Sequence, residues 1–205
     1  MTEDQQNLMK EYEEKRQERL QDAKKRDPQQ SETHRATTIY HGTQQQFGGR
    51  YKSFIDAPSY LRAKEHECYL PKKWLHTWNG HDKGVQRIQF FPKFGHLLLS
   101  GSHDGTVKIW DVLTHRKCLR TYMGHTKAVR DIQFTNDGRK FLSASFDKVI
   151  QLWDTETGKV IRSFTNRKTP FCVKFHPAED KQHIFLAGCA NKKILQFDTN
   201  SKDIV

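Results

Sequence analysis

A motif that recurs about every 43 residues constrains the fold of this chain more than any other feature of its sequence. The first copy, Gly101–Asp111, contains Asp104-Gly105, a dipeptide typical of tight turns, followed by the apolar and polar alternation of a strand. A second copy occupies Ser145–Asp154, and a third, more divergent copy occupies Cys189–Asp198. Repetition at this period predicts an architecture in which successive similar units pack on one another.

Each copy of the motif belongs to a unit of predicted strands, within a folded region over residues 68–205. The units are expected over about 80–123, 124–165 and 166–205, and turn signals such as Asp137-Gly138 separate their strands. Residues 74–78 also alternate as a strand. The expected strands within the units run over 85–91, 96–102, 106–111 and 117–122, then 128–135, 139–145, 149–154 and 159–165, then 171–176, 183–189 and 193–198.

The N-terminal third of the sequence has a different composition. Residues 1–27 lack glycine and proline, are rich in Glu, Gln, Lys and Arg, and are followed by Pro28, which predicts a charged helix. Its apolar stripe is thin and broken, which indicates a solvated helix or one that docks on a partner. Residues 28–67 are polar with scattered aromatic side chains, so we expect a polar extended linker that orders on assembly.

The chain carries a formal net charge of +11. Acidic and basic residues nearly cancel within residues 1–27, so the excess positive charge lies in the remainder. A basic folded region is typical of proteins that associate with nucleic acid or with a ribonucleoprotein, and it also occurs as an ordinary basic surface. Hydrophobic residues make up only 35% of the sequence, which indicates that part of the chain is not packed into a core.

The cysteines and the apolar runs bear on the cellular compartment. Cys68, Cys118, Cys172 and Cys189 form no Cys-x-x-Cys pair, so the sequence predicts neither a zinc site nor a disulfide framework and favours a reducing compartment. No apolar run approaches the length of a membrane span, and the polar N-terminus is not typical of a signal peptide. We therefore expect a cytosolic or nuclear protein.

The repeats resemble those of the WD40 family of β-propellers, because Gly-His opens the first two units and Trp-Asp ends their third strand. The resemblance implies an all-β fold, a partial propeller of about three blades whose ring is not closed in this chain, preceded by a helical and extended N-terminal segment. It also implies a buried hydrogen-bonded relay in each blade, with Ser100 and Ser143 as alternatives for its serine. The implied relays consist of His81, Ser102, Asp104 and Trp110, and of His125, Ser145, Asp147 and Trp153.

The third unit departs from the relay pattern, with Arg167, Cys189, Asn191 and Phe197 in place of His, Ser, Asp and Trp. We expect this blade to be the weakest of the three. It would depend on apolar packing by Phe171, Val173, Phe175, Phe185 and Leu186.

Ser102-His103-Asp104 places the residue types of a hydrolase triad next to one another. Successive side chains on a strand and turn point to opposite sides, so these three cannot converge on a substrate. No phosphate-binding loop or cluster of metal ligands stands out elsewhere in the sequence. We expect no enzymatic activity, no cofactor and no metal.

Stretches in and around the repeats resemble a family of WD40 splicing factors that act at the second catalytic step. They are Cys68–Lys73, Gly95–Ser100, Gly124–Ile132, Trp153–Gly158 and Asn166–Lys168. The divergence of the third unit is also part of this resemblance. The resemblance implies a non-catalytic scaffold of the spliceosome in the nucleus. Its partners would be spliceosomal proteins, with spliceosomal RNA near the N-terminal extension, and neither a small-molecule substrate nor a membrane.

The residues expected to contact partners lie in the predicted turns and in two basic pairs. They are Lys72, Lys73, Lys83, His103, Lys127, Phe146, Arg167, Lys168 and Thr169. The sequence leaves open an adaptor outside splicing, such as a ubiquitin-ligase substrate receptor or a ribosome-assembly factor, because propellers serve many partners. It also leaves open a module that binds RNA alone. Closed propellers have four to eight blades, so three units predict a fragment or a short form that completes its ring by oligomerising.

Overall fold

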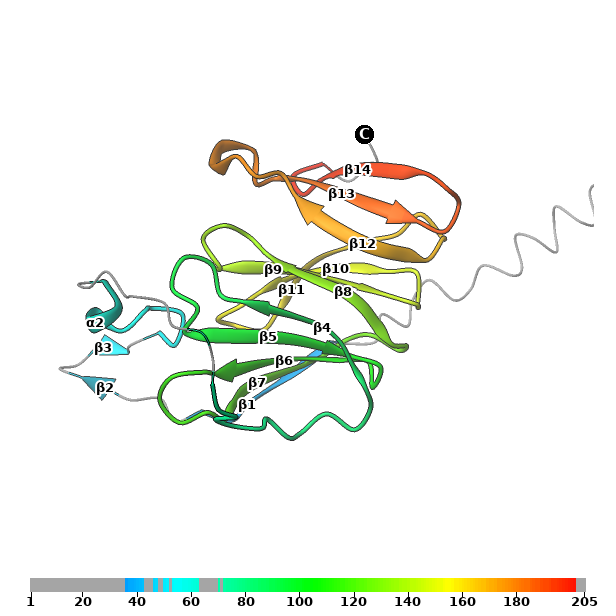
Figure 1. Cartoon of the computed structure of the whole chain (residues 1–205). Helices are drawn as coiled ribbons and strands as arrows, with labels where there is room; N and C mark the ends of the chain where they lie inside the picture. Colours follow the sequence, from blue (N-terminus) through cyan, green and yellow to red (C-terminus); the bar gives the residue numbers. More distant parts are fainter. Residues whose placement is uncertain are drawn as a thin grey trace, which may run out of the picture. The chain divides into compact units, whose positions relative to one another are not determined.

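The computed structural model describes residues 36–42, 46–47, 50–51, 53–62, 70 and 72–201. The charged helix expected over residues 1–27 lies outside these ranges. Twelve of the described strands form three antiparallel sheets that follow one another along the chain and lie side by side (Figure 1). We call these sheets the first, second and third blades.

Each blade is built from strands that are neighbours in the sequence, because short hairpin turns return the chain antiparallel to itself. The first blade has the strand order β1 (Thr37–Tyr40), β7 (Cys118–Met123), β6 (Thr106–Asp111), β5 (Leu97–Ser102) and β4 (Val85–Phe90). The second has the order β11 (Val160–Phe164), β10 (Ile150–Asp154), β9 (Lys140–Ser145) and β8 (Val129–Phe134). The third has the order β12 (Pro170–Phe175), β13 (Ile184–Cys189) and β14 (Ile194–Asp198).

The eleven strands expected within the repeat units are all present, with bounds that differ from the predicted ones by at most one residue. The expectation of a strand over residues 74–78 is wrong, because these residues form no ladder with any described strand. Alternation of side chains makes a segment fit a sheet, but a strand also needs a neighbour for its backbone N–H and C=O groups. The Trp78 indole instead donates to the Asp111 carbonyl oxygen over 3.4 Å.

Part of the N-terminal region packs on the first blade. Strand β1 pairs with β7, and the guanidinium of Arg120 on β7 lies 4.9 Å from the ring centre of Tyr40 and 5.8 Å from that of Phe54. His96 contacts the carbonyl oxygen of Ile55 over 3.1 Å. Residues 28–67 were expected to form a linker that orders on assembly, yet these contacts already order its described part within this chain.

Two small elements complete this region. Strands β2 (Gln46–Phe47) and β3 (Arg50–Tyr51) form a hairpin, and helix α2 (Ser59–Arg62) follows it. The connection between β12 and β13 contains a short helix, η1 (Glu179–Lys181). None of the helices in the described ranges is long and apolar enough to cross a membrane.

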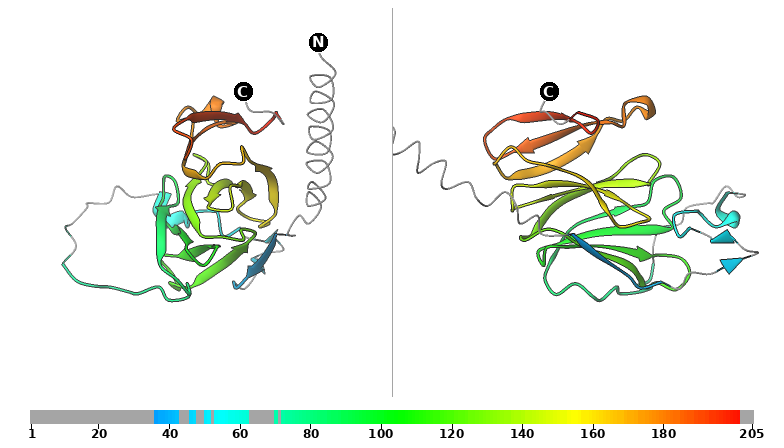
Figure 2. Two further views of the ribbon diagram at one scale, coloured as in Figure 1. Left: turned by 90° about the vertical axis from the view of Figure 1, so that its right-hand side faces the viewer. Right: turned by 180° about the vertical axis from the view of Figure 1, so that it is seen from behind.

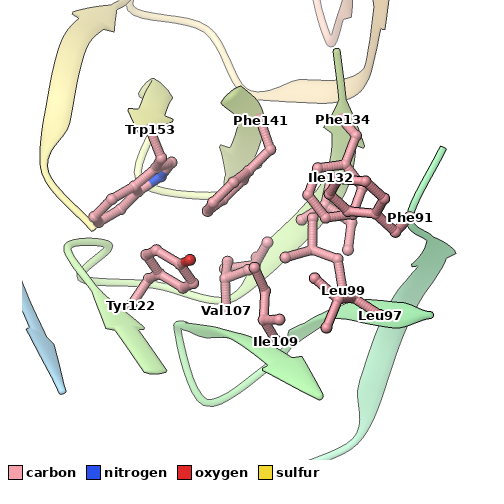
Figure 3. Close-up of a cluster of buried hydrophobic side chains, with 11 residues drawn as sticks. Phe91, Leu97, Leu99, Val107, Ile109, Tyr122, Ile132, Phe134, Phe141 and Trp153 are labelled. Carbon is pink, nitrogen blue, oxygen red and sulfur yellow. The ribbon is translucent and has the colours of Figure 1, made fainter. Parts of the chain in front are cut away.

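The hydrophobic cores lie between adjacent blades. Between the first and second blades, the rings of Tyr122, Phe141 and Trp153 pack together, and all three side chains are fully buried (Figure 3). The Tyr122 hydroxyl donates to the Thr155 carbonyl oxygen over 2.6 Å, so its polar atom is satisfied inside this core. Burial of each such side chain contributes about 1.5–3 kcal/mol, so packing between neighbouring blades is a main source of stability.

A second core joins the second and third blades. Val173, Phe175 and Phe185 are buried in it, as the sequence predicted. Phe171 and Leu186 are not, with 46% and 45% of their surface exposed, so their expected packing role is wrong. Leu186 pairs with Lys174 across the sheet, on the face that points away from the second blade, and no described sheet covers that face.

Candidate functional site

A continuous chain of hydrogen bonds crosses the first blade from its surface turn to its core. His81 Nδ1 lies 2.8 Å from Asp104 Oδ2, and His81 Nε2 lies 2.7 Å from Ser100 Oγ. The indole N–H of Trp110, which is buried, donates to the same hydroxyl over 2.7 Å. The relay is thus continuous from the Asp104 carboxylate through the imidazole and the Ser100 hydroxyl to the indole.

The second blade repeats this geometry closely. His125 Nδ1 lies 2.8 Å from Asp147 Oδ2, His125 Nε2 lies 2.6 Å from Ser143 Oγ, and the Trp153 N–H donates to Ser143 over 2.8 Å. The relays therefore fix the turns at one end of the blades to the blade cores.

The serine of the relay is Ser100 in the first blade and Ser143 in the second, which the sequence analysis gave as the alternatives. Ser102 Oγ instead donates to the Gly84 carbonyl oxygen over 3.1 Å and accepts from the Asp104 N–H over 3.2 Å. Ser145 Oγ likewise donates to the Lys127 carbonyl oxygen over 3.1 Å. The assignment of Ser102 and Ser145 to the relays is therefore corrected. Residues two apart on a strand share a face, so the sequence did not decide which serine lies level with the indole.

The relay aspartates are held in their ionised form. Burial by itself raises the pKa of Asp104, but hydrogen bonds from Thr106 and His81 outweigh it and lower that pKa to about 2. Burial likewise opposes ionisation of Asp147, and contacts with His125 and the Val149 N–H hold its pKa below the usual value. Both carboxylates are thus committed to structure.

The consecutive Ser102, His103 and Asp104 do not form a catalytic triad. Ser102 is fully buried, His103 is exposed, and Asp104 faces His81. Within the part of the chain that the structure describes, no group of three or more His, Cys, Asp or Glu residues could hold a metal ion.

The third blade replaces the relay with apolar packing. Ala187 stands where Ser100 and Ser143 stand in the other blades, and Phe197 stacks on Phe185 with ring centres 5.0 Å apart. Cys189 stands at the position of Ser102, and its Sγ accepts a hydrogen bond from the Asn166 side-chain amide over 3.2 Å. At the position of Asp147 the third blade has Asn191, so this turn contains no carboxylate.

The turns that the sequence analysis singled out meet at one end of the blades. In each blade the turn between the second and third strands is hydrogen-bonded to the loop that precedes the first strand. The bonds are His103 N–H to Gly84 O at 3.0 Å, Phe146 N–H to Ala128 O at 3.0 Å, and Ala190 N–H to Thr169 O at 2.9 Å. We call this end the turn rim, and it faces the viewer in the left view of Figure 2.

Seven of the nine predicted partner residues lie on the turn rim: Lys83, His103, Lys127, Phe146, Arg167, Lys168 and Thr169. Phe146 and Thr169 are partly buried and the other five are exposed. Lys72 and Lys73 are exposed too, but they lie in the extended segment before β4 and not on the rim.

The sequence analysis missed three exposed basic residues on the turn rim, namely Lys148, Lys192 and Lys193. Lys148 and Lys192 have φ values of 72° and 63°, at the turn position that Gly105 occupies with φ 83° in the first blade. Alignment of the three repeats would have found them, since a lysine at a glycine position of a tight turn is unusual.

Comparison with known proteins supports the repeat assignment. The family described as WD domain, G-beta repeat matches residues 72–111 and 116–154. The β-propeller domain of Cps50 (Swd1) from Myceliophteria thermophila superposes with a TM-score of 0.55 and 29% identity, covering 61% of this chain and 38% of that one. These matches and the three open sheets confirm the expected fold class, an all-β, partial WD40 propeller.

Curated relatives match over a longer stretch. The chain is 58% identical to Pre-mRNA-processing factor 17 of Homo sapiens and of Mus musculus over 139 residues, which is 68% of this chain and 24% of each relative. It is 38% identical to the Saccharomyces cerevisiae protein of the same name over 176 residues, which is 84% of this chain and 38% of the relative. The chain thus spans about a quarter of the length of the human and mouse relatives.

Proposed function

We propose that this chain, which carries WD40 repeats and is a relative of Pre-mRNA-processing factor 17, acts in pre-mRNA splicing as a non-catalytic scaffold in the nucleus. The observation that carries the proposal is the 58% identity to relatives of that name. Its partners are spliceosomal proteins, which it binds through the turn rim and the Lys72-Lys73 pair.

The chemistry of the site supports a scaffold over an enzyme. In the relay pairs His81–Asp104 and His125–Asp147, which resemble acid–base pairs of an enzyme, the two side chains are hydrogen-bonded to each other inside the blades. The relays hold the rim turns in the first two blades, so the backbone that carries His103, Lys127 and Phe146 is ordered before a partner binds. An ordered backbone of this kind binds a partner with little further loss of backbone entropy.

A copurification experiment tests the role in splicing. The tagged chain, expressed in cells and recovered from nuclear extract, is expected to bring down spliceosomal proteins and small nuclear RNA. Replacement of His103, Lys127 and Phe146 by alanine should reduce that recovery. Replacement of Leu113, Arg116 and Lys117, exposed at the opposite end of the first blade, is the matched control. A chain that recovers no spliceosomal component would refute the proposal.

We further propose that the chain acts around the second transesterification, because the motifs at Cys68–Lys73 and Asn166–Lys168 resemble those of second-step factors. In extract depleted of this protein, the free upstream exon and the lariat intermediate should accumulate, and the purified protein should restore ligation of the exons. A block before the first cleavage would instead contradict the second-step assignment.

A further inference from the structure

Positive charge on the turn rim rises from the first blade to the third. Lys83 of the first blade is accompanied by Asp82. In the second blade Lys127 and Lys148 accompany the relay carboxylate Asp147. The corresponding turns of the third blade contain no carboxylate and four exposed basic residues. We give the name basic rim to five exposed basic residues of the second and third blades. They lie in the β9–β10 turn, in the loop before β12 and in the β13–β14 turn: Lys148, Arg167, Lys168, Lys192 and Lys193.

The loss of the relay in the third blade creates this charge difference. Asn191 stands where Asp104 and Asp147 stand, and its Oδ1 still accepts from the Lys193 N–H over 3.4 Å. Asn166 Oδ1 accepts from the Lys168 N–H over 2.9 Å. Amide side chains thus keep the turns closed while removing their negative charge.

Three residues of the basic rim adopt a left-handed backbone: Lys148, Arg167 and Lys192, with φ values of 72°, 62° and 63°. This conformation is unfavourable for any residue with a side chain, so glycine would suit these turns better. Among the residues that the structure describes, none of the five basic side chains has an ion pair or a side-chain hydrogen bond. The five charges of the basic rim are therefore available to an external ligand.

The basic rim is continuous across two blades. The Thr165 hydroxyl donates to the Lys148 carbonyl oxygen over 2.7 Å, and the Ala190 N–H donates to Thr169 over 2.9 Å. These bonds fasten the turns of the second and third blades to the loop that carries Arg167 and Lys168. Figure 1 shows the β13–β14 turn at the end of the sheets opposite η1.

Aromatic side chains accompany the charge. Phe171, which follows the Arg167 loop at the start of β12, has 46% of its surface exposed, and Phe146 beside Lys148 is partly exposed. Lysine and arginine with interleaved aromatic rings are the chemistry of single-stranded nucleic-acid binding, since phosphates take the charges and bases stack on the rings. An acidic peptide would use the charges but leave the rings unused.

We propose that the basic rim binds the phosphate backbone of single-stranded RNA and that Phe171 stacks on one of its bases. This inference goes beyond the protein scaffold proposed above, because it assigns a nucleic-acid ligand to particular residues of the turn rim. It does not depend on a role in splicing.

The test measures binding of a fluorescently labelled oligouridine to the whole purified chain by anisotropy, at several salt concentrations. Replacement of Arg167, Lys168, Lys192 and Lys193 by glutamine should weaken binding about tenfold or more at low salt. The slope of log K against log salt should fall by about 3, because each phosphate contact on a single strand contributes about 0.7. Phe171→Ala should weaken binding about tenfold with the slope unchanged.

Matched controls separate a site from general attraction. Arg139, Lys140, Lys159 and Lys181 are exposed at the opposite end of the blades, and their replacement by glutamine changes the net charge equally. Phe94→Ala, at an aromatic ring that is 38% exposed at that end, matches Phe171→Ala. If the glutamine control variant and Phe94→Ala both bind oligouridine nearly as tightly as the unmodified chain, the proposal is supported.

Three results would overturn the proposal. The first is no binding of oligouridine at low salt, and the second is equal loss in the control variants. The third is polyglutamate binding as tight as RNA binding together with an unaffected Phe171→Ala variant, which would assign the rim to an acidic protein. Copurification with spliceosomal proteins despite a lack of RNA binding would leave the proposed scaffold intact while refuting this site.

Discussion

In the second blade Trp153 stacks on Phe141 with ring centres 6.0 Å apart and donates to Ser143, whereas in the third blade Phe197 stacks on Phe185 at 5.0 Å and has no N–H to donate. Both aromatic pairs are nearly parallel, with interplanar angles of 10°. The same ring packing thus forms with or without a polar relay. What the relay adds is a fixed connection to the surface turn, together with a carboxylate in that turn.

The two blades differ correspondingly at their surface. Asp147 holds its turn through His125 and adds negative charge, whereas Asn191 holds its turn more weakly and adds none. The third blade therefore combines a less restrained turn with a more basic one. At this position of the repeat an aspartate gives a restrained turn with a negative charge, and an asparagine gives a less restrained turn without that charge.

The largest expected effect is on the core that the second blade shares with the first. Trp153→Ala should lower the free energy of unfolding by about 3–5 kcal/mol, because it leaves a cavity beside Tyr122 and Phe141 and removes the relay donor. Denaturant titration measures the loss. Trp74→Ala, at a side chain 84% exposed, should change stability by less than about 0.5 kcal/mol and serves as the control.

A reciprocal exchange at the relay serine tests the comparison directly. Ser143→Ala should lower the free energy of unfolding by about 1–3 kcal/mol, because His125 Nε2 and the Trp153 N–H lose their hydrogen-bond partner inside the blade. Ala187→Ser should also destabilise, by about 1–3 kcal/mol, since it buries a hydroxyl beside Phe197, which offers no partner. Chemical denaturation measures both changes. A stabilising Ala187→Ser would show that the third blade retains a relay geometry.

The pH dependence of stability should come from the relay blades. The folded-state pKa of Asp104 is lowered from 3.8 to about 2, so its ionised form stabilises the folded state. That stabilisation is complete above the unfolded value and is lost as the pH falls from 3.8 toward about 2. Through this window the melting temperature of the unmodified chain should fall more steeply with decreasing pH than that of Asp104→Asn. An equal dependence of the two melting temperatures on pH would contradict the assignment.

The smallest expected effect concerns the strained turns. Lys148→Gly should stabilise the protein by about 0.5–1 kcal/mol, because glycine adopts the φ of 72° without strain at some cost in chain entropy. Gly105→Ala should act in the opposite direction, since its Cβ would lie 3.2 Å from the carbonyl oxygens of His125 and Lys127. Calorimetric melting temperatures of both variants measure the shifts. A destabilising Lys148→Gly would show that the lysine side chain itself supports the turn.

The local parts of the fold were predictable because alternation and turn dipeptides act over a few residues. Strands such as β6 matched their predicted bounds, and the partners of His81 and His125 in the turns were identified correctly. The pairing of β1 with β7 was not predicted, because it joins Thr38 to Tyr122, far apart in the sequence. The residues at 74–78 show the converse, since they alternate like a strand but find no described neighbour.

The candidate site was predictable in part for the same reason. His103 and Lys127 were placed on surface turns correctly, since the motif itself defines those turns. Lys148 and Lys192 were missed, although both stand at the turn position of Gly105; the left-handed backbone at these positions is seen only in the structure.

The sequence by itself determined the number of repeats, the strands within them and the kinds of residue that form the relays. Only the tertiary structure decided which serine joins each relay and which equivalent positions are buried. Three apolar residues at equivalent positions of β4 and β8 show this: Val85, Ile88 and Phe90 are 50%, 58% and 59% exposed, whereas Val129, Ile132 and Phe134 are 0%, 1% and 2% exposed. The side chains are nearly the same, but β8 packs against the first blade, whereas no described sheet covers the corresponding face of β4, and burial depends on what lies opposite.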